Sequence, residues 1–170
     1  MKKGQFYLFT GIVLATFLLA IVIPRSGIGQ ARTGFASLVD NFGKEEPFAV
    51  NQGIAIGDLT DTYDAFVDDF MYYARTRYPT ISIFYCVADD GMLMLRNQLG
   101  EQVTVSGSGF RTTMDAGDEG SVNISRSETL SVEAGAASYE LVMNSNRYQT
   151  AAIFKSQDGD NIRVRVKQFR

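Results

Sequence analysis

The segment from Gln5 to Ile23, QFYLFTGIVLATFLLAIVI, contains no charged residue and is followed directly by Pro24 and Arg25. An α-helix rises about 1.5 Å per residue, so about 20 residues are enough to cross the hydrocarbon core of a bilayer, which is roughly 30 Å thick. No face of the segment is polar, so it does not match the surface helix of a soluble domain. The sequence therefore predicts a transmembrane helix within residues 1–24.

This apolar segment is too long for a typical cleavable export signal. Such a signal has an apolar region of about 7–15 residues, followed by a cleavage site of the small-x-small type. The residues that follow Val22, IPRSGIGQA, offer no A-x-A pattern. Lys2 and Lys3 precede the segment, and basic residues are enriched on the cytoplasmic side of membrane proteins. We therefore predict a single-pass protein of the cell membrane whose C-terminal part is extracytoplasmic.

The four residues Lys2, Lys3, Gly4 and Gln5 stand immediately before the apolar helix. This string resembles the class III signal of archaeal type IV pilins and archaellins. The resemblance implies that a prepilin-type peptidase cuts between Gly4 and Gln5, and that the apolar helix is retained. It also implies that the helix packs with copies of itself, or with other pilin-like subunits, in a filament. Many members of the family carry a glutamate a few residues into the mature helix, where this chain has Phe9 and neighbouring apolar residues. An uncleaved signal anchor is the alternative that the residues leave open.

Residues 25–57 are rich in residues that interrupt helices. Glycine occurs at positions 27, 29, 34, 43, 53 and 57, and proline at position 47. This frequency argues against one continuous helix. We predict a linker or stalk over 25–57, with a short helical turn at 35–42.

Residues 58–78 form the clearest helical pattern of the chain. Apolar and aromatic side chains recur at helical spacing and define one stripe, formed by Leu59, Tyr63, Phe66, Phe70 and Tyr73. Asp58 is a suitable N-cap, and Pro79 marks the end. We predict an amphipathic helix packed on the following domain, with the acidic face at Asp61, Asp64 and Asp68 in solvent.

From residue 79 to residue 170 the pattern has a period of two. The segments with this pattern are TISIFYCVA, MLMLRNQL, EQVTVSG, GSVNIS, TLSVEA, SYELVMN, TAAIFKS and NIRVRVKQF. Short strands separated by polar turns are typical of an antiparallel β-sandwich or barrel. We predict an all-β head domain, with an immunoglobulin-like sandwich as the first choice. Cys86 is the only cysteine and tryptophan is absent, so an antibody-type disulfide and core tryptophan are excluded.

The last strand segment places basic side chains on one face. Arg163, Arg165 and Lys167 alternate with apolar residues. A charged face of this kind protects a sheet edge from unwanted pairing. The alternative is contact with an acidic partner, such as the aspartate face of the 58–78 helix in another copy.

The chain contains no recognisable catalytic or cofactor motif. Histidine is absent, and with it the commonest general base and the commonest zinc ligand. There is no phosphate-binding glycine loop, and the formal net charge of −3 does not favour nucleic acid. Asn123 begins a glycosylation triplet, Asn-Ile-Ser. We expect no enzyme activity, no metal, no cofactor and no nucleic-acid partner.

These patterns together predict a structural or adhesive surface protein. In the first interpretation it is a pilin-like subunit held in the lipid membrane by its retained N-terminal helix. In the alternative it is a single-pass anchored β-sandwich module that recognises another envelope protein or a glycan without forming filaments.

Overall fold

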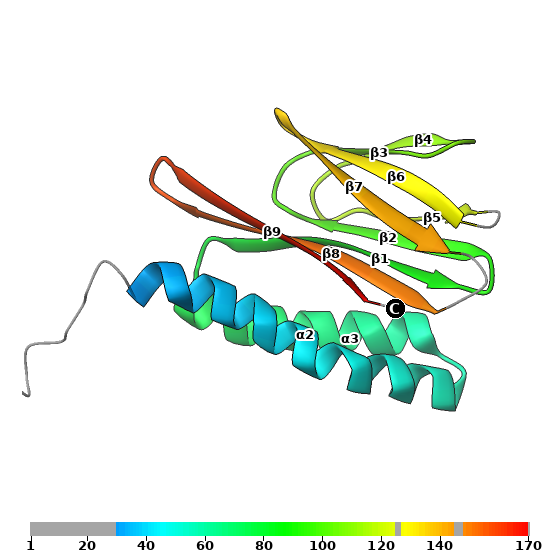
Figure 1. Ribbon diagram of the computed structural model, residues 1–170, viewed down its shortest axis with the longest axis horizontal. Coiled ribbons are helices and arrows are strands. Elements are labelled where there is room, and N and C mark those ends of the chain that lie inside the picture. Colours follow the sequence, from blue (N-terminus) through cyan, green and yellow to red (C-terminus); the bar gives the residue numbers. More distant parts are fainter. Residues whose placement is uncertain (1–29, 125–126, 145–147, 170) are drawn as a thin grey trace, which may run out of the picture. The chain divides into compact units, whose positions relative to one another are not determined.

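Two antiparallel β-sheets and two helices make up the described part of the chain (Figure 1). The computed structural model describes residues 30–124, 127–144 and 148–169. Within them, Phe35 onward belongs to one compact unit. The helices are α2 (Gln30–Ile56) and α3 (Leu59–Arg77); the strands are β1 (Ile81–Asp89), β2 (Met92–Gln98), β3 (Val103–Ser106), β4 (Arg111–Met114), β5 (Glu119–Asn123), β6 (Ser127–Ala134), β7 (Ala137–Asn144), β8 (Gln149–Asp158) and β9 (Asn161–Phe169).

The larger sheet, sheet A, has the strand order β5-β2-β1-β8-β9, and the smaller sheet B has the order β4-β3-β6-β7. All paired strands are antiparallel. The prediction of a mostly β domain with antiparallel sheets and an amphipathic helix is therefore confirmed. The short strand β4 was not predicted; it lies at the edge of sheet B, and only Met114 in it is buried.

Sheet A is covered on both faces, with the helices on one side and sheet B on the other (Figure 1). Successive side chains of a strand point to opposite faces. In β1, Ile83 and Tyr85 therefore enter the apolar core shared with the helices, while Phe84 and Cys86 enter the core shared with sheet B. A strand buried on both faces is apolar at nearly every position. The period-two pattern predicted for TISIFYCVA is therefore wrong, because β1 is buried on both faces.

The predicted linker over 25–57 is wrong for residues 30–56, which form the single 27-residue helix α2. Residues 25–29 lie outside the described part. The helix buries one stripe at helical spacing, formed by Phe35, Leu38, Val39, Phe42, Glu46 and Ala49. Two of its glycines, Gly43 and Gly53, allow close contacts. A Cβ at Gly43 would lie 3.1 Å from the Phe169 ring. Packing of the stripe thus outweighs the weak helix propensity of glycine and proline.

A tight turn joins the two helices into a hairpin. Gly57 has a φ of +75°, and Asp58 donates its backbone N–H to the carbonyl of Gly53 at 2.9 Å. This is the hydrogen bond of a Schellman C-cap, which requires a left-handed residue and so favours glycine. The Asp58 side chain then accepts the N–H of Asp61 at 3.3 Å and begins α3, as predicted.

The α3 helix matches its predicted range, and its buried face is rotated slightly from the predicted stripe. Leu59, Tyr63 and Phe70 are buried, whereas Tyr73 is 50% exposed. Smaller side chains take the inner positions towards the end of the helix, namely Val67, Met71 and Ala74. In the described ranges neither helix is long and apolar enough to cross a membrane. The apolar segment at 5–23 lies outside these ranges.

The close approach of Gly53 in α2 to Leu59 in α3 provides a test of the helical hairpin. A Cβ there would lie 2.7 Å from the Cα of Leu59, a main-chain atom that cannot rotate away. We expect Gly53→Ala to lower the free energy of unfolding by a net of about 1–2 kcal/mol, because overpacking outweighs the gain of about 1 kcal/mol in helix propensity. Urea unfolding followed by circular dichroism measures this change. Gly109→Ala is the control, since no atom lies within 4 Å of a Cβ at that position; equal effects of the two variants would contradict the close contact.

Candidate functional site

The residues predicted from the pilin resemblance, Lys2, Lys3, Gly4 and Gln5, lie outside the described residues. Asn123 is the last residue of β5 and is exposed. The next residue, Ile124, is buried and donates its N–H to the carbonyl of Gly91 at 2.9 Å. The side chain of Asn123 is thus accessible to a modifying enzyme, and its glycosylation stays a prediction.

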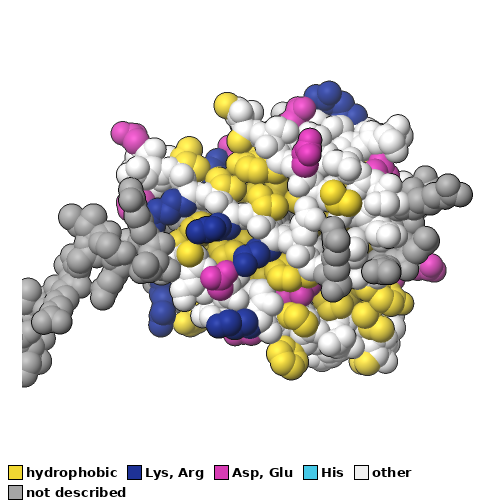
Figure 2. All heavy atoms as spheres, in the orientation of Figure 1, with side chains coloured by type: hydrophobic (Ala, Val, Ile, Leu, Met, Phe, Trp, Pro, Cys, Tyr) yellow, Lys and Arg dark blue, Asp and Glu magenta, His cyan; other side chains and the backbone are white. Residues whose placement is uncertain are grey.

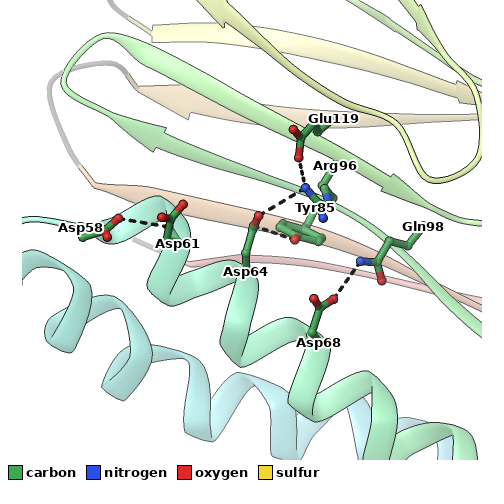
Figure 3. A network of polar contacts seen from close by, with 8 residues as sticks. All are labelled: Asp58, Asp61, Asp64, Asp68, Tyr85, Arg96, Gln98 and Glu119. Atoms are coloured by element: carbon green, nitrogen blue, oxygen red, sulfur yellow. Dashed lines mark hydrogen bonds and ion pairs between the residues drawn. The ribbon is translucent and has the colours of Figure 1, made fainter.

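The acidic face of α3 is more engaged than predicted (Figure 3). Tyr85 donates its hydroxyl to Asp64 at 2.7 Å, and Arg96 lies 3.5 Å from the same carboxylate. Arg96 also pairs with Glu119 of β5. One turn further along α3, the side-chain amide of Gln98 donates a hydrogen bond to the Asp68 carboxylate at 3.0 Å. The expectation of a solvated face therefore holds for Asp61 and Asp68, which are both exposed, and is wrong for Asp64, which is half-buried.

This network connects α3 to three strands of sheet A. Burial raises the pKa of Asp64, while the hydrogen bond from Tyr85 and the charge of Arg96 oppose that rise. Burial and the neighbouring carboxylate also raise the pKa of Tyr85, so its hydroxyl stays protonated as a donor. Arg96 pairs with both Asp64 and Glu119, so the network holds α3 against sheet A. Among the described residues no group of three or more acids or cysteines is arranged to hold a metal ion.

The basic side chains of β9 partly pair within the same chain. Lys and Arg side chains follow β9 across one face of the molecule (Figure 2). Lys167 contacts Asp40 of α2 at 2.8 Å, and this hydrogen bond and charge lower the pKa of Asp40. Arg163 lies 3.9 Å from Asp158. β9 is an edge strand, so the charged face fits the predicted protective role.

Cys86 is buried in the core between the two sheets. Burial raises its pKa to about 12. Its sulfur lies 3.9 Å from the sulfur of Met143. A thiol in such an apolar environment is not a nucleophile at neutral pH.

An open groove lies between the middle of α2 and the strands β8 and β9. Its volume is about 730 Å³, and its walls are formed by Glu46, Pro47, Val50, Asn51, Ile54, Tyr148, Gln149, Thr150, Gln168 and Phe169. Apolar side chains and side-chain amides dominate this set. We call it the Glu46 groove.

Glu46 is the charged group of the groove, and it is only 2% exposed. The hydroxyl of Thr150 donates to its Oε1 atom. Thr150 is its one hydrogen-bond or ion-pair partner within residues 30–124, 127–144 and 148–169. Burial raises the pKa of Glu46, and the hydrogen bond from Thr150 opposes this effect.

The hydroxyl of Tyr63 belongs to the same buried polar cluster. It is fully buried and has no hydrogen-bond partner in the described part of the chain. Burial is the main cause that raises its pKa; the nearby Thr150 side chain opposes this rise, and the charge of Glu46 adds to it. Tyr63 is therefore neutral at physiological pH. Sequence reasoning missed this cluster, because residues 30–56 were not predicted to form a helix and a glutamate is usually taken as solvent-facing.

Glu46 makes stability depend on pH. Because its pKa is raised in the folded state, ionisation is harder in the folded protein than in the unfolded chain. Its contribution is fully present below the pKa of the unfolded chain, about 4.3, and is lost as pH rises through the folded pKa. We expect Glu46→Gln to gain stability relative to the wild type between pH 4 and pH 8, by about 1.4 kcal/mol for each unit by which the pKa is raised.

Urea unfolding at the two pH values measures this gain. Asp64, whose pKa is also raised, is present in both proteins and cancels in the difference. Glu45→Gln, which removes the same charge from the exposed neighbouring position, is the matched control. A stability difference between Glu46→Gln and wild type that is independent of pH would contradict the raised pKa.

Comparisons of this chain with protein-family models, with curated proteins and with solved structures return no match. A function for the chain is therefore inferred from its own residues and geometry.

Proposed function

We propose that this protein is a membrane-anchored, extracytoplasmic surface subunit of the pilin-like class. The observation that carries the proposal is the charge-free segment 5–23, preceded directly by Lys2, Lys3 and Gly4. In this proposal a prepilin-type peptidase cuts between Gly4 and Gln5 and the apolar helix stays in the membrane. The helix packs there with copies of itself or with other pilin-like subunits, and the β-rich unit is displayed as the head. Its role is structural or adhesive.

The short connection between the apolar segment and α2 supports this arrangement. The segment ends at Ile23, and α2 begins at Gln30. The residues between them, 24–29, reach at most about 20 Å even when fully extended. In this proposal the connection between the membrane helix and α2 is therefore short. A subunit that packs through its N-terminal helix needs such a short tether to bring neighbouring heads together.

We further propose that the two sheets form an immunoglobulin-like sandwich. In an immunoglobulin domain strands A, B and E share one sheet, and strands C, F and G share the other. If β1 is strand A, the order β5-β2-β1 corresponds to E-B-A. The order β4-β3-β6-β7 then corresponds to C′-C-F-G. In this proposal β8 and β9 are additions that extend the first sheet beyond strand A and support the helical hairpin.

A second candidate is an anchored binding module that does not form filaments. The Glu46 groove favours it, because a groove of about 730 Å³ lies within the size range of ligand sites, about 300–1,000 Å³. In that case the protein recognises another envelope protein or a glycan and keeps its uncleaved N-terminus. Whether the N-terminus is cleaved therefore distinguishes the two candidate functions.

The test is mass spectrometry of the N-terminus of the full-length protein from cells that contain a prepilin-type peptidase. We expect the mature chain to begin at Gln5. Gly4→Leu should block cleavage, because the peptidase must accommodate the residue before the cut. Gly11→Leu, inside the apolar segment, is the matched control and should be processed normally.

A wild-type chain that still begins at Met1 or Lys2 would overturn the pilin-like proposal and support the uncleaved anchor. If the chain is processed, electron microscopy of cells that produce it should show surface filaments. Cells producing Gly4→Leu should lack them.

A further inference from the structure

We propose that the Glu46 groove binds an organic cation, namely a primary ammonium or guanidinium group carried on an alkyl stem. The inference goes beyond the pilin-like function and does not depend on it. It rests on three features of the groove: an uncompensated buried acid, apolar walls with polar amides, and a rigid wall at Phe169.

The first feature is a missing counter-charge. A buried carboxylate is costly unless it is paired with a cation and hydrogen-bonded. Glu46 has one neutral partner, Thr150, and none of the ion pairs among the described residues includes it. An ammonium or guanidinium group in the groove would supply both the opposite charge and the missing hydrogen-bond donors.

The second feature is the chemistry of the walls. Val50, Ile54 and the ring of Tyr148 line the groove, and Ile54 and Tyr148 are 37% and 47% exposed. An alkyl stem would cover this apolar surface and gain about 25 cal/mol for each Å² removed from water. Amide side chains of Asn51 and Gln168 also line the groove, whereas the side-chain oxygen of Gln149 already accepts the backbone N–H of Asn144 at 2.7 Å. The oxygen atoms of Asn51 and Gln168 can accept the hydrogen-bond donors of a cation that Glu46 leaves unused.

The third feature is preorganisation of the wall at the end of β9. The ring of Phe169 packs against Gly43, where a Cβ would lie only 3.1 Å from it. The same ring has its centroid 6.1 Å from that of Phe42, which is fully buried. A wall held in this way loses little conformational entropy when a ligand binds.

The donor set disfavours a metal ion. A hard divalent cation requires six or more oxygen ligands, usually from several carboxylates. Among the described residues, Glu46 is the one acid in the wall of the groove. One carboxylate with an apolar surround instead matches a monovalent cation on a carbon stem.

Two cations of the same chain must be distinguished from an external ligand. Arg147 precedes Tyr148 in the sequence, and Arg170 follows Phe169. Both arginines lie outside the described residues and carry the chemistry that the groove would recognise. The experiment therefore includes the double variant Arg147→Gln, Arg170→Gln.

The experiment measures binding of small probes to the full-length protein by calorimetry or by nuclear magnetic resonance titration. A neutral maltoside detergent is needed, because zwitterionic headgroups carry a competing cation. The probes are n-pentylammonium, n-pentylguanidinium and the neutral n-pentanol. We expect at least one of the cations to bind about tenfold more tightly than pentanol, or better, which corresponds to about 1.4 kcal/mol.

The variants then identify the group responsible. Glu46→Gln keeps an acceptor for Thr150 and should weaken binding of the cation about tenfold or more. Glu45→Gln, the exposed neighbour, should leave binding unchanged, and circular dichroism verifies that both variants are folded. Comparison of N-acetyl-lysine methylamide with 1,5-diaminopentane shows whether the groove prefers a peptide side chain or a free diamine.

The following results would overturn the proposal. They are absence of binding by either cation, equal affinity for pentanol and the cations, and equal affinity of wild type and Glu46→Gln for the cations. Binding that appears only in the double arginine variant would also overturn it, because the groove would then be filled by the chain itself. The pilin-like function would stand in all these cases, since processing at Gly4 does not involve the groove.

Discussion

Burial of sheet A on both faces is the constraint on which the rest of the fold depends. β1 and β8 supply large apolar side chains to both faces, so neither face can be left in water without a large loss of hydrophobic free energy. Tyr85 and Phe154 are buried because the helical hairpin covers their face of sheet A. Phe84 and Ile153 are buried because sheet B covers the other face. The hairpin is therefore an integral layer of the head and not a separate stalk beneath it.

Phe42 of α2 packs at the contact between the helical layer and sheet A. Its ring centroid lies 5.0 Å from that of Phe70 in α3 and 4.9 Å from that of Phe154 in β8. Both contacts are close to edge-on, the geometry that aromatic pairs favour. Because Phe42 also meets Phe169, one residue joins α2 to its partner helix and to two strands of sheet A. The Glu46 groove lies one turn further along α2, so its walls depend on this cluster.

Much of the fold was predictable from sequence because the local patterns agree with the tertiary structure. The period-two segments and the N-cap at Asp58 needed no long-range information. The helix α2 was missed because Gly43 and Gly53 were interpreted as helix breakers, although they are the places where another segment approaches closely. Such contacts become visible only when the partner, Phe169 or Leu59, is known to be nearby. The strand β4 was missed for a different reason: an exposed edge strand has no apolar period to detect.

The candidate site was missed for a reason that can be stated in energetic terms. A stripe that buries Phe42 and Ala49 would be more stable with leucine or methionine at position 46 than with a buried acid held by one hydroxyl. Sequence patterns treat Glu46 as a solvent-facing residue, because glutamate is seldom buried. Its burial becomes evident only when β8 brings Thr150 across the helix. Glu46 lowers stability in the middle of a well-packed stripe, so the fold alone does not explain why a glutamate stands there. An interaction with a ligand would explain it, and the open groove beside Glu46 has room for one.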